Sequence, residues 1–178
     1  MDGDFENGLA AWRVSGDARV DATQAYTGVQ ALHFPGGPAA SGVATRTITL
    51  PSAPAEATLW FAYRIDTDDW GYGVSPQAPY YDWLTADFRT RDGQQLVSLL
   101  RTGNTADTSS SGLPWDRYLY RMQTIDFAPL AGAGAVDLVF TAQNDGDDLT
   151  TRIWIDAVRF CVTPPVSRLF WPLMLGQE

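Results

Sequence analysis

The sequence predicts an all-β protein: an antiparallel β-sandwich (jelly roll) of about ten strands. Short segments of alternating apolar residues recur roughly every ten to fifteen positions, with turn residues between them. Of the 178 residues, 22 are Trp, Tyr or Phe and 27 are Gly or Pro, a composition typical of many strands and turns. No convincing long helix interrupts the strands, and a run of strands without a helix rhythm favours a sandwich.

The strand at residues 58–65 shows the pattern most clearly, because Leu59, Phe61, Tyr63 and Ile65 fall on one face. Residues 51–58 are too rich in proline for a helix. The same alternation predicts further strands at residues 29–34, 42–50, 82–90, 95–100, 117–125, 135–142 and 151–162. The connections at 66–79 and 102–114 are longer than hairpin turns, and connections of that length more often carry function.

The predicted jelly-roll domain covers residues 1–162, and residues 163–178 form a Pro-rich linker and an apolar C-terminal tail. This tail would either pack on the domain or dock elsewhere in a longer protein. The chain contains no run of 18 apolar residues, so we expect no membrane span.

The charge balance restricts the partners of the protein. The formal net charge is −9, and all 12 basic residues are arginine. Nucleic acids and anionic membranes bind strongly basic surfaces, so both are unexpected partners. Cations and neutral ligands are more plausible.

A carboxylate lies inside the last predicted strand, at Asp156. The apolar positions change phase at this point, from Ile153 and Ile155 to Val158, which predicts a β-bulge that re-aims the side chain. Glu6 is a similar carboxylate among apolar residues near the N-terminus. If the first and last strands are neighbours, the two carboxylates and backbone carbonyls would form an oxygen site for Ca²⁺. The alternative is separate pairing, with Asp156 held by an arginine or backbone N–H groups and Glu6 in solvent.

Two stretches carry a family resemblance: "GDFENGLAAW" followed by "YTGVQALHF" near the start, and "IWIDAV" near the end. They resemble the opening and closing strands of bacterial jelly-roll modules. The resemblance covers about residues 3–162. It is greatest to the MAM-like jelly rolls appended to secreted bacterial peptidases and glycosidases, and it extends to jelly-roll carbohydrate-binding modules.

The resemblance implies a structural Ca²⁺ held by Glu6 and Asp156, with Asp4 and a group near Asp21 as further ligands. It also implies that the chain is an ancillary piece of a secreted or cell-surface protein, although the N-terminus itself shows no signal-peptide pattern. Two more acidic runs, at residues 66–69 and 145–148, can each be a solvated turn or a second cation site. The solvated turn is the simpler interpretation.

The sequence offers little catalytic machinery, so we expect a non-enzyme. The only histidine is His33, in a strand-like segment, and a structural role fits it best. A Gly-x-Ser-x-Gly elbow and a phosphate-binding loop are both absent from the sequence. Neither the three glutamates nor the aspartates form an evident pair for glycoside hydrolysis.

An aromatic-rich region at residues 68–83 is the best candidate for ligand binding, because sugars commonly stack on aromatic rings. It contains Trp70, Tyr72, Tyr81 and Trp83. The alternative is that these rings cover the ends of the core or pack on a neighbouring domain. The other tryptophans of the domain lie within or beside apolar strands and are expected in the core: Trp12, Trp60, Trp115 and Trp154.

Three functions follow from these features. The first is a calcium-stabilised, non-catalytic module for attachment or interaction with a neighbouring domain. The second is a carbohydrate-binding module that holds a polysaccharide or glycan on the aromatic platform. The third and weakest is a jelly-roll glycoside hydrolase or lyase. Exposure of the four aromatic residues would favour the second.

Overall fold

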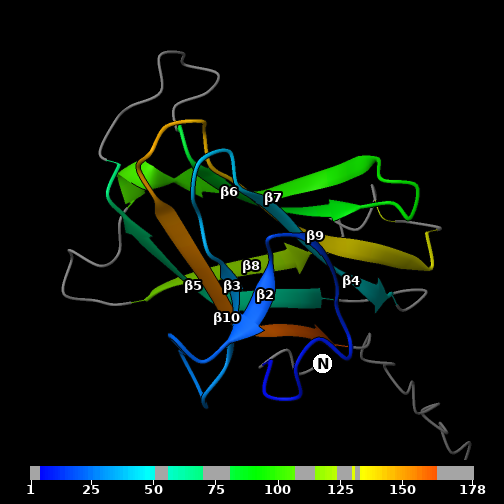
Figure 1. Cartoon of the computed structure of the whole chain (residues 1–178). Coiled ribbons are helices and arrows are strands. Elements are labelled where there is room, and N and C mark those ends of the chain that lie inside the picture. The colour runs from blue at the N-terminus through cyan, green and yellow to red at the C-terminus, as the bar shows by residue number, and fades with distance from the viewer. Residues whose placement is uncertain are drawn as a thin grey trace, which may run out of the picture.

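A computed structural model of the chain describes residues 5–50, 56–69, 81–106, 115–123, 130 and 133–163 (Figure 1). Within them lie ten strands and one short 3-10 helix, Asn104–Ala106. The strands are β1 (Arg13–Gly16), β2 (Arg19–Asp21), β3 (Ala31–Phe34), β4 (Ser41–Thr49), β5 (Glu56–Thr67), β6 (Trp83–Arg89), β7 (Gln95–Gly103), β8 (Asp116–Gln123), β9 (Ala135–Gln143) and β10 (Thr151–Thr163). In this part of the chain no helix is long and apolar enough to cross a membrane.

The strands form two antiparallel sheets of five strands each, which confirms the predicted all-β sandwich. The order is β1-β4-β9-β6-β7 in the first sheet and β2-β3-β10-β5-β8 in the second. Figure 1 shows the two sheets as separate layers. Strands β1 and β2 were not predicted, because they are only four and three residues long and carry little apolar alternation.

The core between the sheets is built from the inward-facing residues of each strand. Phe61 of β5, Phe88 of β6 and Phe140 of β9 are fully buried, and the rings of Phe61 and Phe140 meet edge to face at 5.0 Å. Trp12 packs against Phe140 at 5.7 Å and against Phe5 at 5.3 Å. The segment before β1 is therefore anchored in the core, which positions Glu6.

The predicted bulge in β10 is present. The register between β10 and β5 shifts between Asp156 and Arg159, and Ala157 has a φ of 52°. A non-glycine residue in this left-handed region is uncommon and marks a tightly determined backbone. The bulge lets Ile153 and Ile155 face the core on one side of it and Val158 and Phe160 on the other. Residues 164–178, which include the predicted linker and tail, lie outside the described residues.

A glycine at the end of β1 supports a test of this topology. Gly16 has a φ of 67°, and a Cβ atom there would collide with the backbone carbonyl of Ser41 on β4. Gly16→Ala is expected to lower the free energy of unfolding by about 1–3 kcal/mol, through backbone strain and the clash. Gly146→Ala is the matched control, since nothing lies within 4 Å of the added Cβ. Urea denaturation measures both, and equal stability of the two variants would contradict the β1–β4 contact.

Candidate functional site

The carboxylate of Asp156 holds a loop of the second sheet in place. Its Oδ2 accepts hydrogen bonds from the backbone N–H groups of Tyr26 at 2.8 Å and Thr27 at 2.9 Å. Its Oδ1 accepts from the backbone N–H of Ala157 at 2.6 Å. Asp156 is fully buried, so these three donors supply the hydrogen bonds that a buried carboxylate requires. The bulge therefore aims the carboxylate at the loop between β2 and β3.

Glu6 binds the same loop a few residues further on. Its Oε1 accepts from the backbone N–H groups of Val29 at 2.8 Å and Gln30 at 2.9 Å. Gly28, which lies between Thr27 and Val29, has a φ of 70°, and a Cβ there would collide with the Glu6 carboxylate. The structure therefore brings Glu6 and Asp156 to the same loop, and backbone N–H groups are hydrogen-bond partners of both carboxylates. For Asp156, pairing with backbone N–H groups was one of the alternatives that the sequence left open.

The two carboxylates are close enough to influence one another. Burial raises the pKa of Asp156, the three backbone hydrogen bonds lower it, and the charge of Glu6 raises it further. A cation beside them would relieve this unfavourable charge, and their oxygens are donors of the type that Ca²⁺ takes. Within the described ranges no three His, Cys, Asp or Glu side chains form a metal-sized group, so backbone carbonyls would have to complete such a site.

Of the two other candidate metal ligands, only Asp21 is described, and it does not join this pair. Asp4 lies outside the described residues. Asp21 binds elsewhere: its Oδ1 accepts from the Thr23 hydroxyl at 2.6 Å, and its Oδ2 pairs with His33 Nδ1 and, at 3.4 Å, with Arg19. The Asp21 carboxylate therefore organises the start of the β2–β3 loop.

His33 is a buried structural residue. Its ring stacks on Trp154 at 4.5 Å with an interplanar angle of 9°, and the guanidinium of Arg64 lies 5.9 Å from the Trp154 ring. Burial lowers the pKa of His33, and Asp21 offsets part of that shift. This packing explains why a single histidine lies in a strand without a catalytic partner set.

These two groups predict loss of stability in acid. The pKa of Asp21 falls from 3.8 to about 2, because its hydrogen bonds outweigh the effect of burial. The contribution of Asp21 to the free energy of unfolding is present above pH ~4 and is lost as the pH falls toward 2. Because the pKa of His33 is lowered in the folded protein, the free energy of unfolding also falls as the pH drops below about 6.5. Asp21→Asn is expected to remove about 1–2 kcal/mol at pH 7 and less at pH 2, after allowance for solvent screening. Urea midpoints at several pH values measure this, and an equal loss at all pH values would refute it.

A second feature is a polar surface on the outer face of the first sheet. Along β6, Leu84, Ala86 and Phe88 are buried in the core. The alternate residues of the strand point the other way, away from the second sheet. The cross-strand register aligns them with alternate residues of β4, β7 and β9. We call this surface the polar face; it includes Arg13, Thr45, Thr47, Trp83, Thr85, Asp87, Arg89, Arg101, Asp137, Thr141 and Gln143, with Val43 and Val139 among them.

Two charged pairs fix the geometry of the polar face. Asp87 accepts from Arg89 Nη2 at 2.8 Å. Asp137 accepts from Arg13 Nη2 at 3.0 Å and from the Thr47 hydroxyl at 2.6 Å. Both carboxylates are less than 7% exposed although they lie on an outer face. Side chains held in this way are preorganised, so a ligand that uses them loses little affinity to ordering them.

Sequence reasoning missed Asp87 and Asp137. Both are carboxylates within apolar strands, in "TADFR" and "AVDLV". This is the same signal that singled out Asp156. The alternation that placed Phe88 and Leu138 in the core could have placed each carboxylate on the opposite face of its own strand.

Trp83 lies at the edge of the polar face. Its cross-strand neighbours are Gln143 on β9 and Gly103 on β7. The indole is half-buried, and Gly103 has no side chain to cover it from that direction. Tyr81 is also half-buried and precedes β6, in a bend. Trp70 and Tyr72, the other two members of the predicted platform, lie outside the described residues.

Two tryptophans expected in the core lie instead on the outer side of the second sheet. Trp60 and Trp115 are half-buried, and both contact the ring of Tyr26, at 5.7 and 5.8 Å. The exposed Arg159 lies 5.8 Å from the Trp60 ring. The prediction was wrong for these two because Trp60 alternates with the buried Leu59 and Phe61 and so faces outward. Trp12 and Trp154 are buried as expected.

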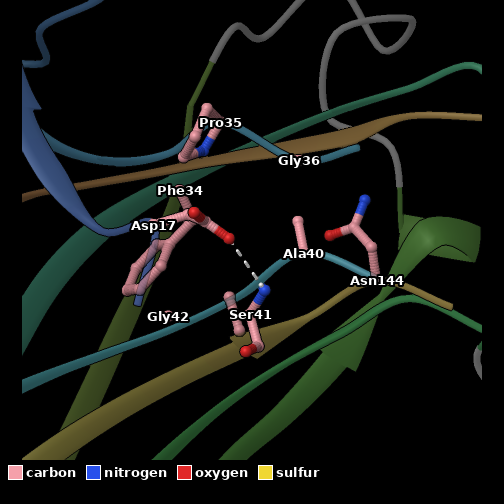
Figure 2. Close-up of a pocket in the computed structure, with 9 residues that line it drawn as sticks. Asp17, Phe34, Pro35, Gly36, Ala40, Ser41, Gly42 and Asn144 are labelled. Atoms are coloured by element: carbon pink, nitrogen blue, oxygen red, sulfur yellow. Dashed lines mark hydrogen bonds between the residues drawn. The ribbon is translucent and has the colours of Figure 1, made fainter. Parts of the chain in front are cut away.

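A small pocket lies between the β3–β4 connection and β9 (Figure 2). It is lined by Phe34, Gly36, Ser41 and Asn144 among others, and Figure 2 shows Ser41 donating its N–H to Asp17, at 3.2 Å. Its volume of about 10 Å³ matches a single water molecule and is far too small for a sugar ring. Any saccharide would therefore bind elsewhere, and an open face such as the polar face is the appropriate kind of surface.

The solved structures that are similar to this chain share its fold. No protein-family model matches the chain, and the search of curated proteins found no match. Among solved structures, the module TmCBM61, in complex with beta-1,4-galactotriose, is similar with a TM-score of 0.61 and 15% identity, over 90% of this chain and 95% of that one. A CBM28 module described as specific for non-crystalline cellulose is similar with a TM-score of 0.54 and 15% identity, over 89% and 91% of the two chains.

A third similar structure is an enzymatically active domain of tailspike protein 4 from bacteriophage CBA120. The TM-score is 0.55 and the identity 13%, over 90% of this chain but only 21% of that one. At these identities the similarity establishes the fold alone. The chain therefore has the β-sandwich fold found in carbohydrate-binding modules. These structures do not bear on the MAM-like resemblance or the peptidase context.

Proposed function

We propose that the protein is a carbohydrate-binding module whose binding surface is the polar face of the first sheet. The observation that carries this proposal is the pair of buried, arginine-paired carboxylates, Asp87 and Asp137, on an outer sheet face beside Trp83. Paired charges give fixed donors and acceptors for sugar hydroxyls, and the indole offers an apolar surface for a pyranose ring. The solved structures with this fold, two of which are carbohydrate-binding modules, support the proposal.

The proposed ligand is a polysaccharide chain rather than a single sugar. The polar face extends across β4, β9, β6 and β7, so several sugar units would have contacts at once. A neutral or weakly acidic chain suits it best, because Arg13 and Arg89 balance their carboxylate partners and Arg101 adds one further positive charge. A non-catalytic role is part of the proposal, and it is favoured by the two binding modules over the tailspike enzyme.

We also propose that Glu6 and Asp156 hold a structural Ca²⁺. The support is their position at one loop and the effect of the Glu6 charge on Asp156. Bound calcium would neutralise both carboxylates and stabilise the loop between β2 and β3. Its other ligands would be backbone carbonyls.

The proposed place of action is outside the cell, on a secreted or surface-attached protein. Structural polysaccharides are extracellular, and a module of this size would attach a neighbouring domain to them. The sequence resemblance to modules appended to secreted enzymes supports the same location.

A panel of soluble polysaccharides tests the proposed function directly. In native affinity gels containing galactan, non-crystalline cellulose derivatives, xylan or mannan, the protein is expected to be retarded by at least one of them. Bovine serum albumin serves as the unretarded control. The same mobility in every gel, repeated with Ca²⁺ present, would reject carbohydrate binding as the function.

A further inference from the structure

A group of buried polar residues lies at one end of the sandwich, next to the Trp83 end of the polar face. It is placed where β5 and β7 end and where β6 and β10 begin. We name it the polar end layer: Thr67, Asp69, Asp82, Asn104 and Thr151, each less than 5% exposed. Figure 1 shows the neighbouring β9–β10 and β3–β4 connections side by side, joined by the hydrogen bond from Asn144 N to Ala40 O, at 2.8 Å.

Hydrogen bonds tie the polar end layer together across both sheets. The Asn104 side-chain amide donates to Asp69 Oδ2 at 2.9 Å, and the Asn104 backbone N–H donates to the carbonyl of Asp82 at 3.1 Å. The Thr67 and Thr151 hydroxyls are 2.6 Å apart. Asp69, which the sequence placed in a solvated turn, is thus buried. The carboxylates of Asp69 and Asp82, which lie at strand ends, are therefore both buried and close enough for their charges to interact.

One oxygen atom of this layer has unmet bonding capacity. Asp82 is 1% exposed, and its Oδ1 accepts from the backbone N–H of Asp145 at 2.8 Å. Its Oδ2 is fully buried and, among the described residues, has no hydrogen-bond partner of good geometry. Burial raises the pKa of Asp82, hydrogen bonds from the Thr151 side chain and the Asp145 backbone to the carboxylate lower it, and the charges of Asp145 and Asp69 raise it. A buried carboxylate oxygen without a partner is costly, so it indicates a missing positive group.

We propose that the polar end layer is a divalent-cation site, with Asp82 Oδ2 and Asp69 as charged ligands and the hydroxyls of Thr67 and Thr151 beside them. Every donor is an oxygen, and two carboxylates balance one divalent ion. Ca²⁺ is the cation that suits this set best, because it accepts mixed carboxylate, hydroxyl and amide oxygens in irregular geometry. Thiol and imidazole ligands are absent from these five residues, which disfavours Zn²⁺.

The cation would stabilise one end of the fold independently of the Glu6–Asp156 pair. Asp69 follows β5, Asp82 precedes β6, and Asn104 follows β7, so a bound ion would fix three strand ends of both sheets. The proposal does not depend on carbohydrate binding, and each can fail without the other.

Counting bound calcium tests the proposal. The full chain is dialysed against EDTA and titrated with Ca²⁺ by calorimetry, as wild type and as Asp82→Asn. The amide keeps the shape and the acceptor for Asp145 N–H but removes the charge. Asp82→Asn is expected to bind one Ca²⁺ fewer than wild type, and Asp147→Asn, an exposed member of the adjacent acidic run, to bind the wild-type number. Equal stoichiometry in wild type and Asp82→Asn would overturn the site.

A second variant keeps the test decisive if Asp82→Asn fails to fold. Asn104→Asp adds a third carboxylate to the layer. With a cation bound there, the affinity for Ca²⁺ is expected to rise at least ~10-fold, and the melting temperature to fall in EDTA and recover with Ca²⁺. An unchanged calcium affinity, with a melting temperature that is low in both buffers, would overturn the proposal.

Discussion

Asp156→Ala is expected to lower the melting temperature of the protein by roughly 10 °C even without calcium. The change removes an acceptor from three backbone N–H groups, those of Tyr26, Thr27 and Ala157. Losing hydrogen bonds to a buried charged group is expected to cost about 3 kcal/mol or more in total. In a protein of this size each kcal/mol corresponds to roughly 2–4 °C in melting temperature. Differential scanning calorimetry in EDTA measures the effect.

The same variant separates the hydrogen-bonding role from the proposed calcium role. In Ca²⁺ buffer the wild-type melting temperature is expected to rise, and the part of that rise due to the Glu6–Asp156 pair is expected to disappear in Asp156→Ala. Asp66→Ala is the control, because Asp66 is partly exposed on the same sheet and its contact with Arg64 is long, at 3.9 Å. A calcium-induced rise of equal size in wild type and Asp156→Ala would rule out a calcium ion at this pair.

Trp83→Ala is expected to weaken polysaccharide binding by about 10- to 100-fold. Losing a large aromatic contact with a ligand typically costs roughly 2 kcal/mol or more, and 1.4 kcal/mol is a factor of ten in affinity. The fold should persist, because Trp83 lies on the outer side of β6 and the core contacts come from Leu84 and Phe88. Isothermal titration with the polysaccharide that retards wild type measures the change.

Trp60→Ala is the matched control for this experiment. Trp60 is also a half-buried strand tryptophan, but it lies on the second sheet, beside Tyr26 and Arg159. Its loss is expected to leave the affinity within about twofold of wild type. A larger loss in Trp60→Ala than in Trp83→Ala would move the binding surface to the second sheet.

The fold was accessible from the sequence because alternation along long strands is a strong signal. Strands β5, β9 and β10 are each nine residues long or more, and each was predicted from its alternating apolar residues, with one change of phase at the bulge in β10. The bulge was also predicted, because a phase change in the apolar pattern has few other causes. Strands β1 and β2 were not predicted, because their own residues show no clear alternation. Pairing of β1 with β4 and of β2 with β3 determines these two strands.

The site was less accessible, because alternation gives the face of a residue but not its neighbours on other strands. Asp137 and Arg13 are 124 positions apart, and only the strand order makes them a pair. Trp60 was wrongly predicted for a different reason. Its apolar neighbours in the sequence suggested a core residue, but Trp60 alternates with them along the strand and therefore faces outward. Asp69 looked like part of a solvated turn until Asn104 and Thr67 were placed around it.

The central claim is that a polysaccharide binds on the polar face of the first sheet, and the indole N–H signals of the tryptophans test it most directly. Wild-type protein labelled with ¹⁵N is titrated with the retained polysaccharide, and each indole signal is assigned by single Trp→Phe replacements. With the polysaccharide on the polar face, a chemical-shift change is expected for Trp83 and none for Trp60 or Trp154, which lie on the second sheet. Shifts at Trp60 or Trp154 with Trp83 unmoved would contradict it.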